Sequence, residues 1–176
     1  MSQPLRSIVD LEELVQALPP EDRERFGRIF RLDTTTGELL PPAFMHAWIQ
    51  KYFGSVDAVR KQRIVKVTNL ITMEGSLFNE LRASRPMETA AGEDLLEKIT
   101  QSAGDPFCHP LDGTPEDVFG RVKGTRSVTA SNVAKCDGFH GLLIFDEHNP
   151  LVFDAAAVKD SLDTALAWAR KAHCED

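Results

Sequence analysis

Several features are scarce in this 176-residue sequence, and each scarcity excludes a class of protein. Uncharged apolar runs fall short of the roughly 18 residues that a membrane-spanning helix requires. The first 14 residues carry acidic side chains where a secretory signal needs an apolar run. Lys and Arg total 20 against 27 Asp and Glu, and the resulting net charge of -7 has the wrong sign for a protein that coats nucleic acid. The sequence therefore predicts a cytoplasmic protein without a membrane or polymeric nucleic acid as partner.

Cysteine is scarce as well. Cys108, Cys136 and Cys174 are odd in number and widely spaced, so they fit no disulfide framework and reduced thiols are expected. Gly/Ser linkers and internal repeats are also missing. Because 42% of the residues are hydrophobic, the chain can bury one sizeable core. These features predict one domain with a helical N-terminal extension.

The first sixty residues predict a helical N-terminal extension. Apolar residues recur at helical spacing over residues 8–18, and Pro19 and Pro20 end that helix. A second helix is expected over Glu21–Arg31, and the segment Asp33–Gly37 is rich in turn-forming residues and predicts a loop. A third helix is expected to start at Pro41–Pro42, with an apolar face made of Phe44, Met45, Trp48, Ile49 and Phe53.

Residues 61–176 predict strands and two further helices. Ile64–Met73 is β-branched and alternating, which indicates a strand, and Leu77–Phe78 can form its partner after a turn at Glu74–Gly75. Two more strands are expected over residues 126–131 and 141–145, and a helix within residues 87–104.

The last helix has the clearest pattern in the chain. Asp154 is expected to be its N-cap, with Arg170 and Lys171 in its last turn. Its apolar face consists of Val158, Leu162, Ala165, Leu166 and Ala169, a spacing typical of a helix that packs this face on the core.

Two arginines form the first candidate site. Arg82 and Arg85 flank a serine just before Pro86, in a chain whose net charge is negative. Guanidinium groups suit phosphate because they present a rigid fork of donors. The alternative is an ordinary solvated charged surface.

A second candidate site follows at residues 105–109. Asp105, Cys108 and His109 offer an oxygen, a sulfur and a nitrogen donor, all of which can ligate zinc. The chain lacks the cysteine pairs of a four-cysteine ribbon. Asp105 can equally be a helix cap and Cys108 a buried thiol.

The third candidate site lies within residues 129–150. Small polar residues including Asn132, followed by a glycine-containing loop, allow close approach of a nucleotide or sugar. His140 and His148 bracket an apolar strand, where a histidine is more often a hydrogen-bonded structural residue than a ligand. Cys136 could be a nucleophile, but the sequence places no base beside it.

The order of these motifs resembles the N-terminal half of the galactose-1-phosphate uridylyltransferase family. The matching elements are Leu81–Pro86 (LRASRP), Asp105–Cys108 (DPFC) with Gly113–Pro115 (GTP), Ser131–Asn132, Gly141–His148 (GLLIFDEH) and the long helix that follows. The similarity spans about Gln62–His173. It implies an α+β fold of the histidine-triad-like superfamily, with a mainly antiparallel sheet, over residues 61–176.

The resemblance also implies roles for individual residues. Arg82 and Arg85 match arginines that lie near the phosphates of a nucleotide sugar, and Asn132 matches an asparagine that contacts the uridine. Cys108 and His148 match two zinc ligands, and Asp105 stands where the first zinc cysteine is usual. The resemblance therefore implies either structural zinc ligated by Asp105, Cys108 and His148 or an empty site held together by hydrogen bonds.

The family's nucleophile has no counterpart in this sequence. Transferases of the family use a histidine in an HPHxQ-like segment after the long helix, and none of the five histidines here has an HxH context: His46, His109, His140, His148 and His173. No catalytic residue is therefore assigned. The expected function is the nucleotide- and phosphate-binding half of a hexose-1-phosphate uridylyltransferase-like nucleotidyltransferase, acting on a UDP-sugar or nucleoside phosphate, with the remainder supplied by a C-terminal half or a homodimer.

Two alternatives remain open. The chain could be a self-contained, non-catalytic nucleotide-binding or interaction module, in which case the N-terminal helices should cover the sheet. It could also be a zinc-dependent hydrolase that uses Asp105, Cys108 and His148, although no general base is placed near them.

Overall fold

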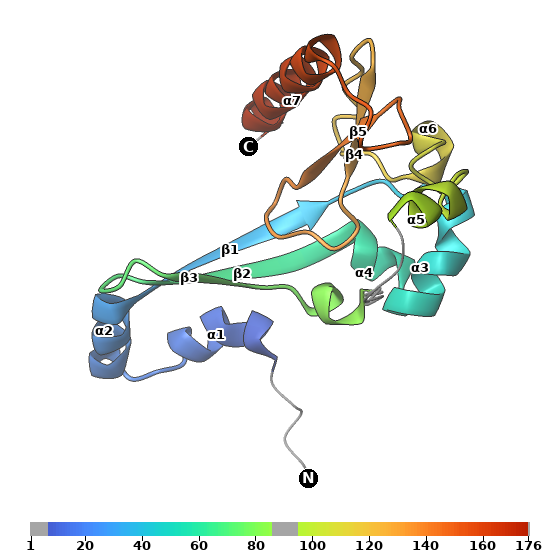
Figure 1. Cartoon of the computed structure of the whole chain (residues 1–176). Coiled ribbons are helices and arrows are strands. Elements are labelled where there is room, and N and C mark those ends of the chain that lie inside the picture. Colours follow the sequence, from blue (N-terminus) through green and yellow to red (C-terminus); the bar gives the residue numbers. More distant parts are fainter. Residues whose placement is uncertain (1–6, 86–94, 176) are drawn as a thin grey trace.

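The chain folds as an α+β protein with antiparallel sheets and a long C-terminal helix (Figure 1). The computed structural model describes residues 7–85 and 95–175. Within them, one sheet has three strands and a second sheet has two. The expected fold class is confirmed at the level of α+β with antiparallel sheets.

The three-stranded sheet has the order β1-β2-β3. It consists of β1 (Phe30–Glu38), β2 (Lys61–Asn69) and β3 (Gly75–Phe78). The expected strand and its partner at residues 77–78 are confirmed, but β2 ends at Asn69 rather than Met73. It ends there because the Asn69 side-chain carbonyl accepts the backbone N–H groups of Ile71 and Thr72, which turns the chain.

The expected loop at Asp33–Gly37 is wrong, because this segment lies inside β1. Its residues pair with β2 in an unbroken antiparallel register from Phe30 opposite Asn69 to Glu38 opposite Lys61. Three consecutive β-branched threonines favour a strand once a partner is available. One sheet therefore joins the expected N-terminal extension to the rest of the chain.

The N-terminal helices lie against this sheet and at its end (Figure 1). They are a 3-10 turn η1 (Ile8–Asp10), α1 (Leu11–Gln16) and α2 (Pro20–Ile29). The Arg63 guanidinium of β2 forms ion pairs with Glu12 and Glu13, which holds α1 near the strand.

An apolar cluster lies at the other end of the sheet. The chain passes through η2 (Ala43–Met45), α3 (His46–Phe53) and α4 (Val56–Arg60) into β2. The buried members of the cluster are Leu39, Met45, Ile49 and Val59. The expected apolar face of the third helix is therefore only partly buried, since Phe44 and Trp48 remain exposed.

The second sheet consists of β4 (Ser127–Ser131) and β5 (Gly141–Phe145), both of which were expected. Before it come η3 (Glu80–Ser84), α5 (Leu95–Gln101) and α6 (Pro110–Gly113). The helix expected within residues 87–104 is thus α5, and the part of that prediction over residues 87–94 lies outside the described residues.

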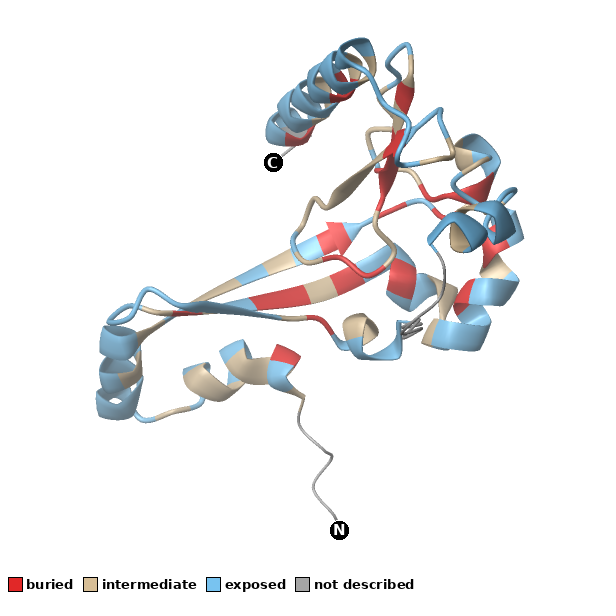
Figure 2. Cartoon of the chain, viewed as in Figure 1, coloured by how far each residue is buried: buried red, intermediate tan, exposed pale blue. Residues whose placement is uncertain are grey.

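The C-terminal helix α7 (Ala155–Glu175) packs on β4 and β5 with a different face from the expected one. Its buried side chains include Ser161, Thr164 and Ala172, whereas all five residues of the expected core face are exposed. Figure 2 shows that most of the α7 ribbon has the colour of exposed residues. The Asp160 carboxylate explains this orientation, because it accepts the backbone N–H groups of Thr125 and Arg126. The expected N-cap is confirmed, with Asp154 accepting the N–H of Ala157 at 2.7 Å.

A buried polar cluster connects these elements. We call it the polar core: Gln62, Asn79, Asp117, Ser131 and Lys135, each at most 9% exposed. The Asp117 carboxylate accepts the Ser131 hydroxyl at 2.6 Å, the Lys135 ammonium at 3.4 Å and the indole N–H of Trp168 from α7 at 2.7 Å.

The two amides of the polar core fix the backbone around Lys135. Gln62 accepts the Lys135 N–H at 3.1 Å and donates to the Val59 and Val133 carbonyls. Asn79 donates to Gln62 at 2.8 Å and to the Lys135 carbonyl at 2.9 Å. The Lys135 side chain passes so close to Gly37 that a Cβ there would lie 2.6 Å from its Cδ, so β1 needs glycine at this position.

Replacing Asp117 by alanine should strongly destabilise the fold. The change leaves the Lys135 ammonium buried without its counter-charge, at a cost on the order of 3–5 kcal/mol in the free energy of unfolding. Lys135→Met should cost less, because Asp117 keeps the Ser131 and Trp168 donors. Urea denaturation measures both, with the exposed Asp22→Ala on α2 as a control that should change little. A larger loss for Lys135→Met than for Asp117→Ala would contradict this account.

Candidate functional site

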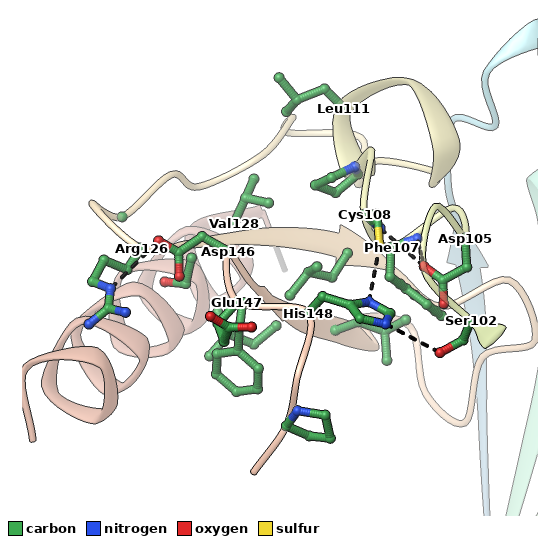
Figure 3. A pocket seen from close by; sticks show the side chains of 18 of the residues that line it. Ser102, Asp105, Phe107, Cys108, Leu111, Arg126, Val128, Asp146, Glu147 and His148 are labelled. Carbon is green, nitrogen blue, oxygen red and sulfur yellow. Dashed lines mark hydrogen bonds and ion pairs between the residues drawn. The ribbon is translucent and has the colours of Figure 1, made fainter. Parts of the chain in front are cut away.

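An open cleft of about 1510 Å³ lies beside β5 and is the larger of two candidate regions. Its walls come from residues 98–111, 123–128 and 142–150, and all three expected zinc ligands line it (Figure 3). Its charges are balanced, with Lys98, Lys123 and Arg126 against Asp105, Asp146 and Glu147. Because these charges balance, the cleft is not a cationic surface.

The cleft brings Cys108 and His148 into contact. The Cys108 sulfur lies 3.1 Å from His148 Nδ1, although the two residues are 40 positions apart in the sequence (Figure 3). On the other side of the ring, Nε2 lies 2.6 Å from the Ile99 carbonyl oxygen and 3.4 Å from the Ser102 hydroxyl.

These contacts fix the tautomer of His148. A carbonyl oxygen can only accept, so Nε2 carries the proton and Nδ1 presents its lone pair to the Cys108 thiol. A backbone carbonyl on the far ring nitrogen is also the usual support for a histidine that ligates a metal through its other nitrogen. The pair thus offers one sulfur and one nitrogen donor to the same point.

Asp105 has a different role in the structure. Its Oδ1 accepts the backbone N–H groups of Phe107 at 2.8 Å and Cys108 at 3.1 Å, so it stabilises the turn that presents the thiol. Among residues 7–85 and 95–175, no three His, Cys, Asp or Glu side chains are grouped closely enough to hold a metal ion. Cys108 and His148 are donor types that zinc uses, but Asp105 does not complete a three-donor set with them.

The second candidate region is the loop between β4 and β5, residues 132–140, which we call the 132–140 loop. The Asn132 side-chain carbonyl accepts the Ala134 N–H at 3.1 Å, and the Arg82 guanidinium donates to the Ala134 carbonyl at 3.0 Å. Asn132 and Arg82, two of the three expected substrate-binding residues, therefore both bond to the backbone of Ala134. Neither of them lines the cleft.

His140 closes the 132–140 loop. Its backbone carbonyl accepts the Asn132 N–H at 2.8 Å, and its Nδ1 accepts the Cys136 N–H at 3.1 Å. Since a backbone N–H can only donate, Nδ1 of neutral His140 is unprotonated and Nε2 carries the hydrogen. The Asn132 amide nitrogen lies 3.5 Å from this Nε2, so two donors face each other without being able to bond.

Two cations, Lys135 and Arg82, lie near His140 of the 132–140 loop. Burial lowers the pKa of His140 below its usual 6.5 and these cations lower it further, while Asp117 and Asp137 oppose the shift. Burial also lowers the pKa of Lys135, while Asp117 opposes that shift. A ligand that brings hydrogen-bond acceptors and negative charge would complement both the paired donors and these cations.

The remaining expected residue, Arg85, is exposed at the C-cap of η3, three positions after Arg82. The expectation that His140 is a hydrogen-bonded residue at a strand end is confirmed, but the sequence interpretation did not include it in the candidate site. The four-residue spacing from Cys136 to His140 across a glycine-containing loop was the available signal, because it allows the imidazole to fold back on the loop backbone.

Comparison of the chain with protein-family models, with curated proteins and with solved structures finds no match. Within the described ranges, none of the helices has the length and apolar character needed to cross a bilayer.

Proposed function

We propose that the 132–140 loop, together with Arg82, binds the phosphate-bearing part of a nucleotide or nucleotide sugar. The observation that carries this proposal is the convergence of donors: the Asn132 amide and the protonated Nε2 of His140 face one another 3.5 Å apart. Two donors at that distance both require acceptors, and a phosphate oxygen can accept from both.

Arg82 adds charge to this donor pair. Its guanidinium has five N–H donors, and the Ala134 carbonyl takes one from Nη1. Lys135 contributes to the potential through its position in the polar core, where it is fully buried. Arg85 lies three residues from Arg82 and is included in the proposed phosphate site on that spacing and on the resemblance.

The site fits the resemblance to hexose-1-phosphate uridylyltransferases and their histidine-triad-like fold. In that proposal the chain is the nucleotide-binding half of a nucleotidyltransferase-like protein, and no nucleophile is assigned to it. The N-terminal helices lie against the β1-β2-β3 sheet, whereas apolar side chains of β5 and α7 remain exposed, among them Phe145 and Leu162. This exposure favours a half that works with further protein over a self-contained module.

The zinc part of the proposal rests on Cys108 and His148 alone. Their donor atoms and the Ile99 support are of the kinds that zinc uses, and as two of the four ligands of a structural zinc they would join the turn after α5 to the segment after β5. Asp105 is left out because its carboxylate serves the turn. A zinc-dependent hydrolase is not favoured, since catalytic zinc is held by three protein ligands beside an open water position, and Cys108 and His148 supply two.

Asn132→Asp should weaken binding of uridine 5′-monophosphate or UDP-glucose by at least about tenfold. The aspartate keeps the oxygen that accepts the Ala134 N–H, but it replaces the amide donor with a negative charge beside the phosphate. Arg82→Ala and Arg85→Ala should also weaken binding. Titration calorimetry measures the affinities, and Arg25→Ala on the exposed face of α2 is the surface-charge control. Equal affinity in the wild type and in all three site variants would refute the assignment.

Cys108→Ser should abolish stoichiometric zinc binding, because it removes the sulfur donor and leaves a single imidazole. Asp105→Asn is the matched control: it keeps the oxygen that caps the turn, so zinc should be retained. Metal analysis of the purified proteins gives the result directly. A wild-type protein that takes up no zinc, or a Cys108→Ser variant that still holds it, would contradict this part of the proposal.

A further inference from the structure

Helix α7 exposes a continuous apolar stripe. Val158 is 45% exposed, Leu162 66% and Leu166 51%, and Ala165 and Ala169 lie on the same exposed face. We call these five residues the α7 stripe. The helix packs on the sheet through its more polar side, so the side richest in leucine has no partner among the described residues.

The α7 stripe continues beyond the start of the helix. Phe153, which is 72% exposed, forms a shallow groove of about 480 Å³ together with Val158 and Leu162. Leu151 and Val152 are exposed next to it in the sequence. Contiguous apolar surface of this kind on a charged protein marks a docking surface.

We infer that the α7 stripe is covered by the same stripe of a second copy of this chain, with the two helices antiparallel. The stripe is complementary to itself in this arrangement. A two-fold axis between Ala165 and Leu166 sets Leu162 opposite Ala169 of the second copy, and Leu166 opposite Ala165. Each large side chain then meets a small one, as close helix packing requires.

The charges beside the α7 stripe also select the antiparallel arrangement. Asp163, which pairs with Lys159 of its own helix, and Arg170 are exposed on the same flank of the stripe. In the antiparallel register, Asp163 lies within two residues, or about 3 Å along the axis, of Arg170 of the second copy. This attraction occurs twice by symmetry, and the helix dipoles oppose one another favourably. In a parallel two-fold pair the same flank of each helix lies on opposite sides of the contact, so Asp163 and Arg170 of the two copies would not meet.

Leu162→Asp tests the interface, because it puts a charge at the centre of the proposed contact. Sedimentation equilibrium of the whole chain should show a wild-type dimer, and this variant should raise the dimer dissociation constant at least about tenfold. Ile71→Asp is the matched control: Ile71 is 73% exposed at the β2–β3 turn, so the same substitution there should leave the dimer intact. Circular dichroism should show unchanged monomer folding, since Leu162 is mostly exposed.

A charge exchange tests the antiparallel register. Asp163→Arg alone and Arg170→Asp alone should each weaken the dimer, and the double variant should restore it, because the exchanged charges meet across the two-fold axis. A monomeric wild type, a Leu162→Asp dimer as tight as wild type, or a double variant weaker than both single variants would each overturn the inference.

Discussion

The buried contact between Lys135 and Asp117 is the constraint on which the rest of the structure depends. A fully buried ammonium is tolerated only with a counter-charge and satisfied hydrogen bonds, and Asp117 supplies the counter-charge. Because Asp117 also binds Ser131 of β4 and Trp168 of α7, the same carboxylate fixes the second sheet and the long helix. The amides of Gln62 and Asn79 extend this network into the first sheet.

The candidate binding site is a direct extension of that network. Lys135 lies inside the 132–140 loop, so the bonds that bury it also hold the backbone from which Asn132 and His140 project. A rigid loop can keep two donors close together without a shared acceptor, because the hydrogen bonds of the surrounding structure offset the free-energy cost of their repulsion. This preorganisation supports the proposal that the loop binds an anion.

Local pattern predicted much of the fold, and tertiary partners decided the rest. β2, β4, β5 and the Asp154 cap follow from alternation and capping chemistry. β1 was missed because Asp33–Gly37 carries turn-forming residues, and only its pairing with β2 makes it a strand. The prediction of which face of α7 is buried was also wrong. The hydrogen bonds that Asp160 accepts from the 125–126 backbone outweigh the hydrophobic pattern in setting the orientation of the helix.

The candidate site was predictable in part. Motif order pointed to Arg82 and Asn132, which meet at Ala134, and to Cys108 and His148, which are in contact. The role of Asp105 as a turn cap and the tautomer of His140 depend on backbone groups brought close by folding. No spacing in the sequence fixes which atom donates at such a contact.

Nuclear magnetic resonance titration of the His140 imidazole tests the central claim most directly, with His140→Gln assigning the signal. A phosphate bound between His140 and Asn132 would stabilise the imidazolium, so uridine 5′-monophosphate should raise the pKa of His140 from its lowered position. Uridine without phosphate should leave that pKa where it is. A His140 pKa that does not move at saturating nucleotide, or that responds equally to uridine, would contradict the proposed phosphate site.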